Sequence, residues 1–304
     1  MTAPSFVPHV VDLMFQGRSR AIATGVIRTP AGVLLVDPGP ATCIARLVRT
    51  LAELGIASRD LHGLLLTHIH LDHAGAAGTM VRHHPHLKVY VHERGAPHLI
   101  DPARLLASAG RLYGADMDRL WGEFAPVPAA NVRVPADGDV LVFGGVEIDV
   151  AYTRGHASHH MCYRERRSGI VYAGDTGGIR VGPSAYVLPP TPPPDIDLPA
   201  WQASVARIRA WKPTGVFVTH FGLYRDADVH LAALSAELEA WERLSAEILG
   251  GEADEASRAM RFIDTVRARI QERVTPAEVA AYSDAMSLDD CWTGLARYWQ
   301  KGSQ

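Results

Sequence analysis

Cysteine is scarce in this chain of 304 residues, which limits both its redox chemistry and its metal chemistry. The three cysteines, Cys43, Cys162 and Cys291, are far apart, odd in number and form no CxxC pair. This pattern fits a reducing compartment better than a disulfide framework, so we expect a cytoplasmic protein. Any metal site must then be built from histidine and aspartate.

Long apolar runs and an excess of positive charge are also missing. No window approaches about 18 uninterrupted apolar residues, and the start, MTAPSFVPHVVDLMF, has no basic region followed by a long apolar stretch. We therefore expect neither secretion nor a membrane span. The formal net charge is −3, and residues from 225 onward contain nine Lys or Arg against fifteen Asp or Glu. The chain therefore lacks the excess of basic residues that is typical of a nucleic-acid-binding protein. A small-molecule substrate is the expected partner.

Two hydrophobic patterns divide the chain. Residues 1–224 alternate short β runs with helical patterns, which predicts an α/β fold. From residue 225 onward, apolar residues recur at helical spacing, and Thr275-Pro276-Ala277-Glu278 has the composition of a helix start. We expect a metal-binding catalytic domain over 1–224 and a C-terminal helical extension over 225–304. The proline-rich segment 188–199 is predicted to be a loop.

One short stretch, LLLTHIHLDHAG at residues 64–75, places three histidines and an aspartate directly behind an apolar run. The run predicts a short buried strand, and the polar residues occupy the turn that leaves it. Side chains two apart in extended backbone point the same way, so His68 and His70 converge on one point, while Asp72 and His73 face elsewhere. Imidazole and carboxylate groups are ligands that suit zinc, iron or manganese.

Three further polar residues directly follow other β runs, and they are His156, Asp175 and His220. In an open α/β sheet, ligands bind in the crevice outside the carboxyl ends of the strands. Each residue alone is more readily explained as the cap of a turn. Their recurrence in one structural setting favours a shared metal site.

These motifs together resemble those of the metallo-β-lactamase superfamily. Over about residues 8–224 the chain carries, in order, an HxHxDH motif, a Gly-His pair, a Gly-Asp pair and a last histidine, namely His68, His70, Asp72, His73, Gly155-His156, Gly174-Asp175 and His220. The resemblance implies a four-layer αββα sandwich with a dinuclear centre in the cleft between its β-sheets. Here a C-terminal α-helical extension follows the sandwich.

The resemblance also implies how the metal ions are held. Two divalent ions are expected, with zinc favoured and iron or manganese as alternatives. Asp37 matches the family's early aspartate, whose implied role is to support a ligand histidine. The implied ligands of the first ion are His68, His70 and His156. Those of the second ion are Asp72, His73 and His220, and Asp175 is implied to bind both ions.

Departures from other branches of the family narrow the expected chemistry. Asp175 stands where the commonest true β-lactamases have a cysteine, His70 stands where flavo-diiron proteins have a glutamate, and the basic additions of the nuclease branches are missing. The chain then resembles the glyoxalase II-like hydrolases and thioesterase-like members with a C-terminal helical cap. We expect an enzyme, a metal-dependent hydrolase that uses a bridging hydroxide at a dinuclear centre to cleave a thioester or ester.

Several roles stay open at this point. Asp72 is expected to act in catalysis by steering the hydroxide, and Tyr186 or Tyr224 is a candidate donor to the developing oxyanion. A persulfide dioxygenase-like iron oxidoreductase and a regulatory binding protein with a vestigial metal site are the alternative functions. Apolar stripes predict that the helical extension covers the cleft or forms a homodimer. The sequence names neither the substrate nor the roles of His159, His160 and the proline-rich loop.

Overall fold

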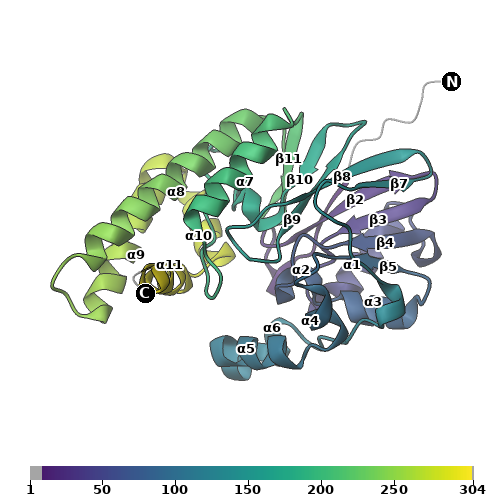
Figure 1. Cartoon of the computed structure of the whole chain (residues 1–304), viewed down its shortest axis with the longest axis horizontal. Helices are drawn as coiled ribbons and strands as arrows, with labels where there is room; N and C mark the ends of the chain where they lie inside the picture. Colours follow the sequence, from purple (N-terminus) through teal and green to yellow (C-terminus); the bar gives the residue numbers. More distant parts are fainter. Residues whose placement is uncertain (1–8, 303–304) are drawn as a thin grey trace.

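The computed structural model describes residues 9–302 and contains two β-sheets packed face to face (Figure 1). The first sheet has the order β1-β2-β3-β4-β5-β6, with strands His9–Asp12, Ala23–Thr29, Gly32–Val36, Leu61–Leu65, Lys88–Tyr90 and Val132–Arg133. The second has the order β12-β11-β10-β9-β8-β7. From β7 to β12 its strands are Val140–Phe143, Val146–Tyr152, Met161–Glu165, Ile170–Tyr172, Gly215–Val218 and Gly222–Tyr224.

Helices cover the outer face of each sheet (Figure 1). On the first sheet, α1 (Ile44–Glu53) and α3 (Ala77–His83) contribute buried side chains to a core shared with β4 and β5. On the second, α7 (Leu198–Ala210) buries Trp201 and Val205 in a core shared with β10 and β11. The predicted four-layer αββα sandwich is therefore confirmed.

A third apolar layer lies between the two sheets, where side chains from both meet. The leucines that precede His68 illustrate the arrangement. Leu64 and Leu66 pack in the core between the first sheet and its helices, while Leu65 packs in the layer between the two sheets. Side chains alternate along a strand, so a strand buried on both faces is apolar without interruption. This double burial explains the continuous apolar run that precedes the histidines.

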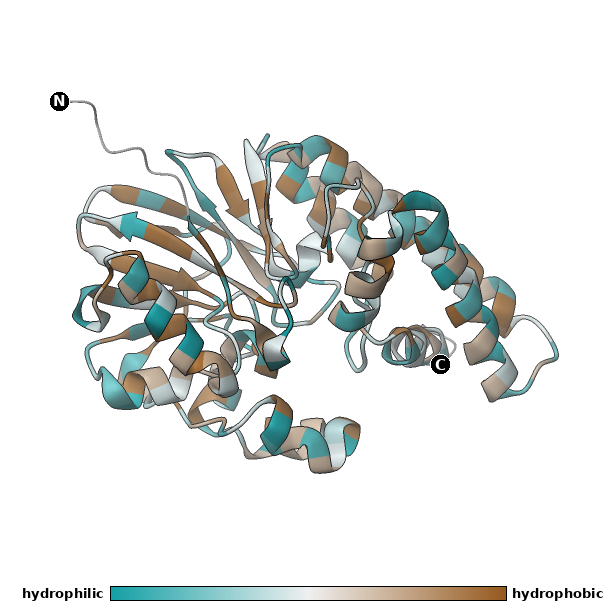
Figure 2. Cartoon of the chain, turned by 180° about the vertical axis from the view of Figure 1, so that it is seen from behind, coloured by the Kyte–Doolittle hydropathy of each residue, from teal (hydrophilic) through white to brown (hydrophobic). Residues whose placement is uncertain are grey.

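The predicted C-terminal helical region is also confirmed. It consists of α8 (Ala227–Leu249), α9 (Glu255–Arg273), α10 (Pro276–Ala285) and α11 (Leu288–Gly302). Figure 2 shows apolar and polar residues interleaved along these helices, and the apolar ones share the core of α7. Among the described residues, no helix is both long enough and apolar enough to cross a membrane.

Three helices that the sequence analysis did not anticipate lie below the first sheet in Figure 1: α4 (Ala96–Ile100), α5 (Ala103–Tyr113) and α6 (Met117–Leu120). The longest, α5, fully buries only Ala109. Its sequence, ARLLASAGRLY, is amphipathic, and the partly buried side chains of Leu105, Leu106 and Tyr113 pack against the core of the first sheet. These helices matter because α5 borders the candidate site.

Candidate metal centre

Seven polar side chains converge beyond the carboxyl ends of strands from both sheets. Strands β3 and β4 are parallel, as are β10 and β11, so each pair opens its carboxyl ends at one edge. The loop after β4 and the short helix α2 (Leu71–Ala74) supply four of the residues, and the loops after β8, β10 and β11 supply the others: His68, His70, Asp72 and His73, then His156, Asp175 and His220.

The seven side chains form two groups. In the first, nitrogens of His68, His70 and His156 lie within 4.8 Å of one another, and His156 Nε2 is 3.1 Å from His70 Nδ1. In the second, Asp72 Oδ2 lies 3.5 Å from His73 Nε2 and 3.2 Å from His220 Nε2. Each group presents three donor atoms to a common point.

Asp175 reaches both groups. Its Oδ2 lies 3.4 Å from His156 Nε2, on the side of the first group. Its Oδ1 lies 3.2 Å from His73 Nε2 and 3.6 Å from His220 Nε2, on the side of the second. A single carboxylate is thus positioned to serve two cations.

Four of the donor atoms have no other use in the fold. They are buried and have no hydrogen-bond partner among the described residues: His68 Nε2, His73 Nε2, His220 Nε2 and Asp175 Oδ1. A buried polar atom left unpaired costs roughly 1–3 kcal/mol, so such a cluster needs a ligand. Two ligands bound to one tetrahedral ion at about 2.0–2.1 Å are themselves about 3.3 Å apart. The nitrogen–oxygen separations of 3.2–3.6 Å match that spacing, and the donor set fits divalent metal ions.

The opposite ring nitrogens of three histidines are fixed by the backbone and by a side chain. His156 Nδ1 lies 2.9 Å from the Pro190 carbonyl, and His220 Nδ1 lies 2.7 Å from the Ala21 carbonyl. His68 Nδ1 lies 3.1 Å from the Thr67 hydroxyl. A nitrogen that donates to a carbonyl carries the proton, which leaves the Nε2 lone pair free to bind a metal.

Asp37 supports the second group from beneath. Its Oδ2 lies 2.8 Å from His73 Nδ1 and accepts hydrogen bonds from the Thr67 and Thr219 hydroxyls. Its Oδ1 accepts a hydrogen bond from the Thr67 backbone N–H. Asp37 is fully buried, and these contacts fix the orientation of the His73 ring.

Burial and neighbouring charges set the protonation of the donors. Burial, reinforced by nearby histidines, lowers the pKa of His68 well below its ordinary value, and burial lowers the pKa of His70 to about 4. Burial also disfavours the charge on Asp72, yet His73 and His220 lower its pKa to about 2. Likewise burial acts against charge on His73, but Asp175, Asp72 and Asp37 raise its pKa well above the ordinary value. The neutral imidazoles of His68 and His70 and the ionised carboxylate of Asp72 suit a cation, and a cation bound at the second group would replace the proton on His73.

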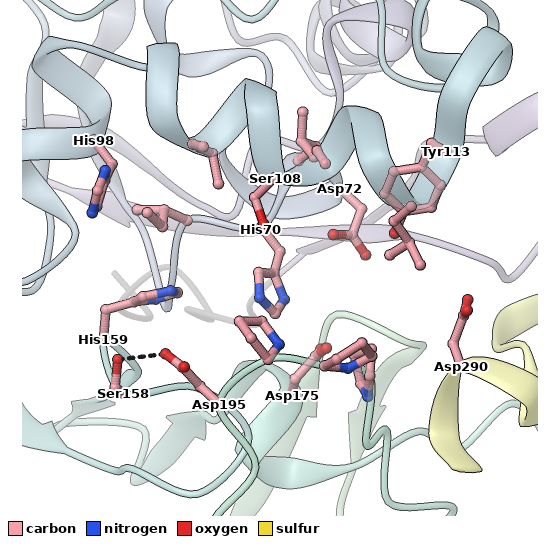
Figure 3. A pocket seen from close by; sticks show the side chains of 18 of the residues that line it. His70, Asp72, His98, Ser108, Tyr113, Ser158, His159, Asp175, Asp195 and Asp290 are labelled. Carbon is pink, nitrogen blue, oxygen red and sulfur yellow. Dashed lines mark hydrogen bonds between the residues drawn. The ribbon is translucent and has the colours of Figure 1, made fainter. Parts of the chain in front are cut away.

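A cleft of about 360 Å³ opens over this centre (Figure 3). His70, Asp72 and Asp175 lie at its floor, and α5 forms one wall. The opposite wall contains prolines 192–194 of the proline-rich loop, with Met286 and Asp290 of the helical extension. The extension thus borders the cleft, as a covering role requires, whereas self-association remains a prediction.

Tyr113, at the end of α5, is a cleft residue that the sequence analysis missed. Figure 3 shows it beside Asp72, and its ring packs edge-on against Trp121 with 5.0 Å between the centroids. Burial, together with the charge of Asp72, raises the pKa of Tyr113, so its hydroxyl stays protonated at neutral pH. That hydroxyl has no hydrogen-bond partner in the described part of the chain and is available to a ligand.

The two tyrosines proposed from the sequence as oxyanion donors do not reach the cleft, so that prediction is wrong. Tyr186 is buried against Tyr282, with 5.4 Å between the ring centroids. The Tyr224 hydroxyl donates to the backbone carbonyl of Arg180. Both tyrosines belong to the core between the second sheet and the helical extension.

The two histidines with open roles have different places. His159 lines the cleft, with its ring 6.1 Å from that of His68. His160 lies behind His68, with 5.0 Å between the rings, and its Nε2 accepts a hydrogen bond from the Thr176 N–H. His160 therefore packs behind a candidate ligand, and His159 faces the space above it.

The fold is an αββα sandwich, and its cluster of histidines and aspartates could hold metal ions. The family model described as the metallo-beta-lactamase superfamily matches residues 18–220, about two thirds of the chain. The chain therefore belongs to the metallo-beta-lactamase superfamily, and the resemblance seen in its motifs is confirmed.

Curated relatives match about half of the chain. It is 28% identical over 151 residues to the hydroxyacylglutathione hydrolase of Aeromonas hydrophila, which covers 50% of this chain and 44% of that protein. It is 28% identical over 154 residues to the atrochrysone carboxyl ACP thioesterase of Aspergillus fumigatus, which covers 50% of this chain and 39% of that protein. The chain thus spans less than half the length of these two relatives.

Solved structures match nearly the whole chain. An archaeal metallo-beta-lactamase superfamily protein from Sulfolobus tokodaii has a TM-score of 0.66 at 20% identity, over 96% of this chain and 99% of that one. A metallo-beta-lactamase family protein from Thermus thermophilus has a TM-score of 0.70 at 20% identity, over 100% of this chain and 95% of that one. At this level of identity the similarity shows the fold alone.

Proposed function

We propose that this chain is a metal-dependent hydrolase that cleaves a thioester or an ester at a dinuclear centre. The observation that carries the proposal is the convergence of the candidate ligands, four of them with unpaired buried atoms, on the floor of a cleft sized for a small molecule. Two relatives that match half the chain are called hydroxyacylglutathione hydrolase and ACP thioesterase, which supports a thioester substrate.

The two groups of donors would each hold one divalent ion, with Asp175 shared between them. Zinc is the first choice for this set of imidazoles and carboxylates, and iron or manganese are alternatives. When bound, such ions supply a water of lowered pKa and polarise a carbonyl group.

Asp72 is proposed to orient the attacking water. Its side chain is 22% exposed and that of Asp175 is 3% exposed, so Asp72 is the more accessible of the two carboxylates of the centre that line the cleft. Its lowered pKa keeps it ionised at neutral pH, and an ionised carboxylate accepts hydrogen bonds from water.

Tyr113 is proposed to donate a hydrogen bond to the substrate carbonyl as negative charge develops on its oxygen. The raised pKa of Tyr113 keeps the proton on the hydroxyl, and the packing of its ring holds the donor in place before the reaction. A thiolate leaving group departs with little help from an acid, which suits a cleft where His98 and His159 stand away from Tyr113.

A thioester panel tests the proposal on the full chain reconstituted with zinc. We expect thiol release from acyl thioesters, with a loss of at least 100-fold in His73→Ala and little change in His83→Ala, which replaces an exposed histidine outside the cleft. Wild-type protein that binds metal but turns over neither thioesters nor esters would overturn the proposal. Oxygen consumption with a persulfide in its place would support the oxidoreductase alternative.

A further inference from the structure

The two ends of the cleft differ in charge, and the residues along α5 show which end is which. Arg104 and Ser108 are four residues apart on α5 and both line the cleft, so they share one face of the helix. Figure 3 shows Ser108 over His70, with His98 toward one end of the cleft and Tyr113 toward the other. Arg104 precedes Ser108 by about 6 Å of helix, so it lies toward the end of His98.

The end near His98 presents two unpaired cations. Arg94 lies before α4, Arg104 lies at the start of α5, and both line the cleft. Neither guanidinium makes a hydrogen bond or an ion pair with any residue from 9 to 302. A guanidinium presents a planar set of donors that matches a carboxylate, and a pair of them in a concave site favours an anionic ligand.

Acidic groups also line the cleft, but they do not cancel this asymmetry. Asp195 lies near His159, where it accepts a hydrogen bond of 2.7 Å from the Ser158 hydroxyl. Burial raises the pKa of Asp195, but this hydrogen bond, His159 and Lys301 together lower it. Asp290 stands at the opposite end in Figure 3, on the side of Tyr113. The apolar side chains of Leu112, next to Tyr113 in α5, and of Met286, four residues before Asp290, also line the cleft. An anion is therefore attracted to the arginine end and repelled from the Asp290 end.

We propose that the substrate carries a carboxylate on the order of 5–10 Å from its scissile carbonyl, one to two helical turns away, and that Arg94 and Arg104 bind this carboxylate. This inference rests on the proposed hydrolase function and names the class of its substrate. The carboxylate belongs either to the acyl part, as in a monothioester of a short dicarboxylic acid, or to the thiol part. The remainder of the substrate occupies the end formed by Leu112, Tyr113 and Met286.

Two matched substrate pairs separate these sources. The first pair is the adipoyl monothioester of N-acetylcysteamine and its neutral methyl ester, which differ only in a charge on the acyl side. The second pair is the acetyl thioester of 3-mercaptopropionate and its methyl ester, which differ in a charge on the thiol side. We expect wild type to prefer the anionic member of one pair by about tenfold in kcat/KM.

The double variant Arg94→Ala/Arg104→Ala should lose that preference and should hydrolyse the thioester of the uncharged member of each pair at the wild-type rate. Arg111→Ala is the matched control, because Arg111 is an exposed arginine of α5 that does not line the cleft. An absent preference in wild type, or a preference that survives in the double variant, would overturn the inference.

A binding measurement keeps the two proposals distinguishable. An NMR titration of metal-free protein with succinate should show saturable binding that the double variant lacks and Arg111→Ala retains. Binding that depends on the two arginines, without turnover of any thioester, would sink only the hydrolase function. Turnover of thioesters without charge preference, and with no such binding, would sink only the carboxylate inference.

Discussion

Replacing Asp37 with asparagine should weaken metal binding, although Asp37 is not itself one of the candidate ligands. Asp37 Oδ2 has three hydrogen-bonding neighbours, the hydroxyls of Thr67 and Thr219 at 2.7 and 2.8 Å and His73 Nδ1 at 2.8 Å. Its Oδ1 accepts a fourth hydrogen bond, from the Thr67 N–H at 2.8 Å. An amide has only one acceptor oxygen, so its NH₂ group must face donors in either orientation.

The magnitude follows from which donors lose their acceptor. With the amide oxygen toward His73, the Thr67 N–H is left unpaired in a fully buried place, at a cost of roughly 1–3 kcal/mol. The other orientation turns the NH₂ group toward the N–H of His73, which is also a donor, so the ring loses its acceptor. His73 also loses the carboxylate that fixes its ring, and loss of such a partner typically lowers metal affinity by roughly 10–100-fold.

The assay is competition for zinc against a chromophoric chelator, with the melting temperature of the metal-free protein measured in parallel. We expect a zinc affinity lower by about 10–100-fold and a melting temperature lower by about 2–6 °C. Asp254→Asn is the control, because Asp254 accepts a hydrogen bond from the Ser257 N–H at the start of α9 and belongs neither to the candidate ligands nor to the cleft lining. An Asp37→Asn protein with wild-type zinc affinity and melting temperature would refute the reasoning.

Three further predictions concern residues outside the ligand set. Tyr113→Phe should lower kcat at least tenfold with metal content unchanged, as steady-state kinetics and metal analysis would test, and an unaltered kcat would remove the donor role. Serine at Cys43, Cys162 and Cys291 together should leave metal binding intact, since all three thiols are buried and none belongs to the groups of candidate ligands, and lost metal in a folded triple variant would contradict this. Burial raises the pKa of Glu278, but hydrogen bonds from Thr275 and Ser184 lower it to about 2 from an ordinary 4.5. A lowered carboxyl pKa stabilises the fold above pH 4.5 and the stabilisation fades as pH falls toward 2, so Glu278→Gln should flatten the dependence of unfolding free energy on pH in that window.

The candidate ligands could be predicted because of where they stand in the sequence. His68 and Asp175 each follow a short apolar run, and the end of a buried strand is visible as the point where such a run meets polar residues. The order of the motifs then indicated the sandwich, and the apolar spacing after residue 225 indicated the helical extension. These features are local in the chain, so one sequence is enough to detect them.

The surroundings of the centre could not be predicted, because they depend on contacts between distant segments. Thr219 meets Asp37 across 182 positions, and His220 meets the Ala21 carbonyl across 199. No local pattern predicts either contact. Tyr113 was missed for a different reason, since the amphipathic pattern of α5 indicates a helix but does not indicate that the end of this helix borders the centre.

The central claim is that the seven donors hold two divalent ions, and metal stoichiometry tests it most directly. The full chain would be reconstituted with zinc, freed of unbound metal, and its zinc content measured by mass spectrometry against protein concentration. The account predicts two ions per wild-type chain and the loss of at least one in Asp175→Asn, whose amide lacks the charge and the second acceptor oxygen needed between two cations. A wild-type chain that holds fewer than two ions, or an Asp175→Asn chain that keeps both, would contradict it.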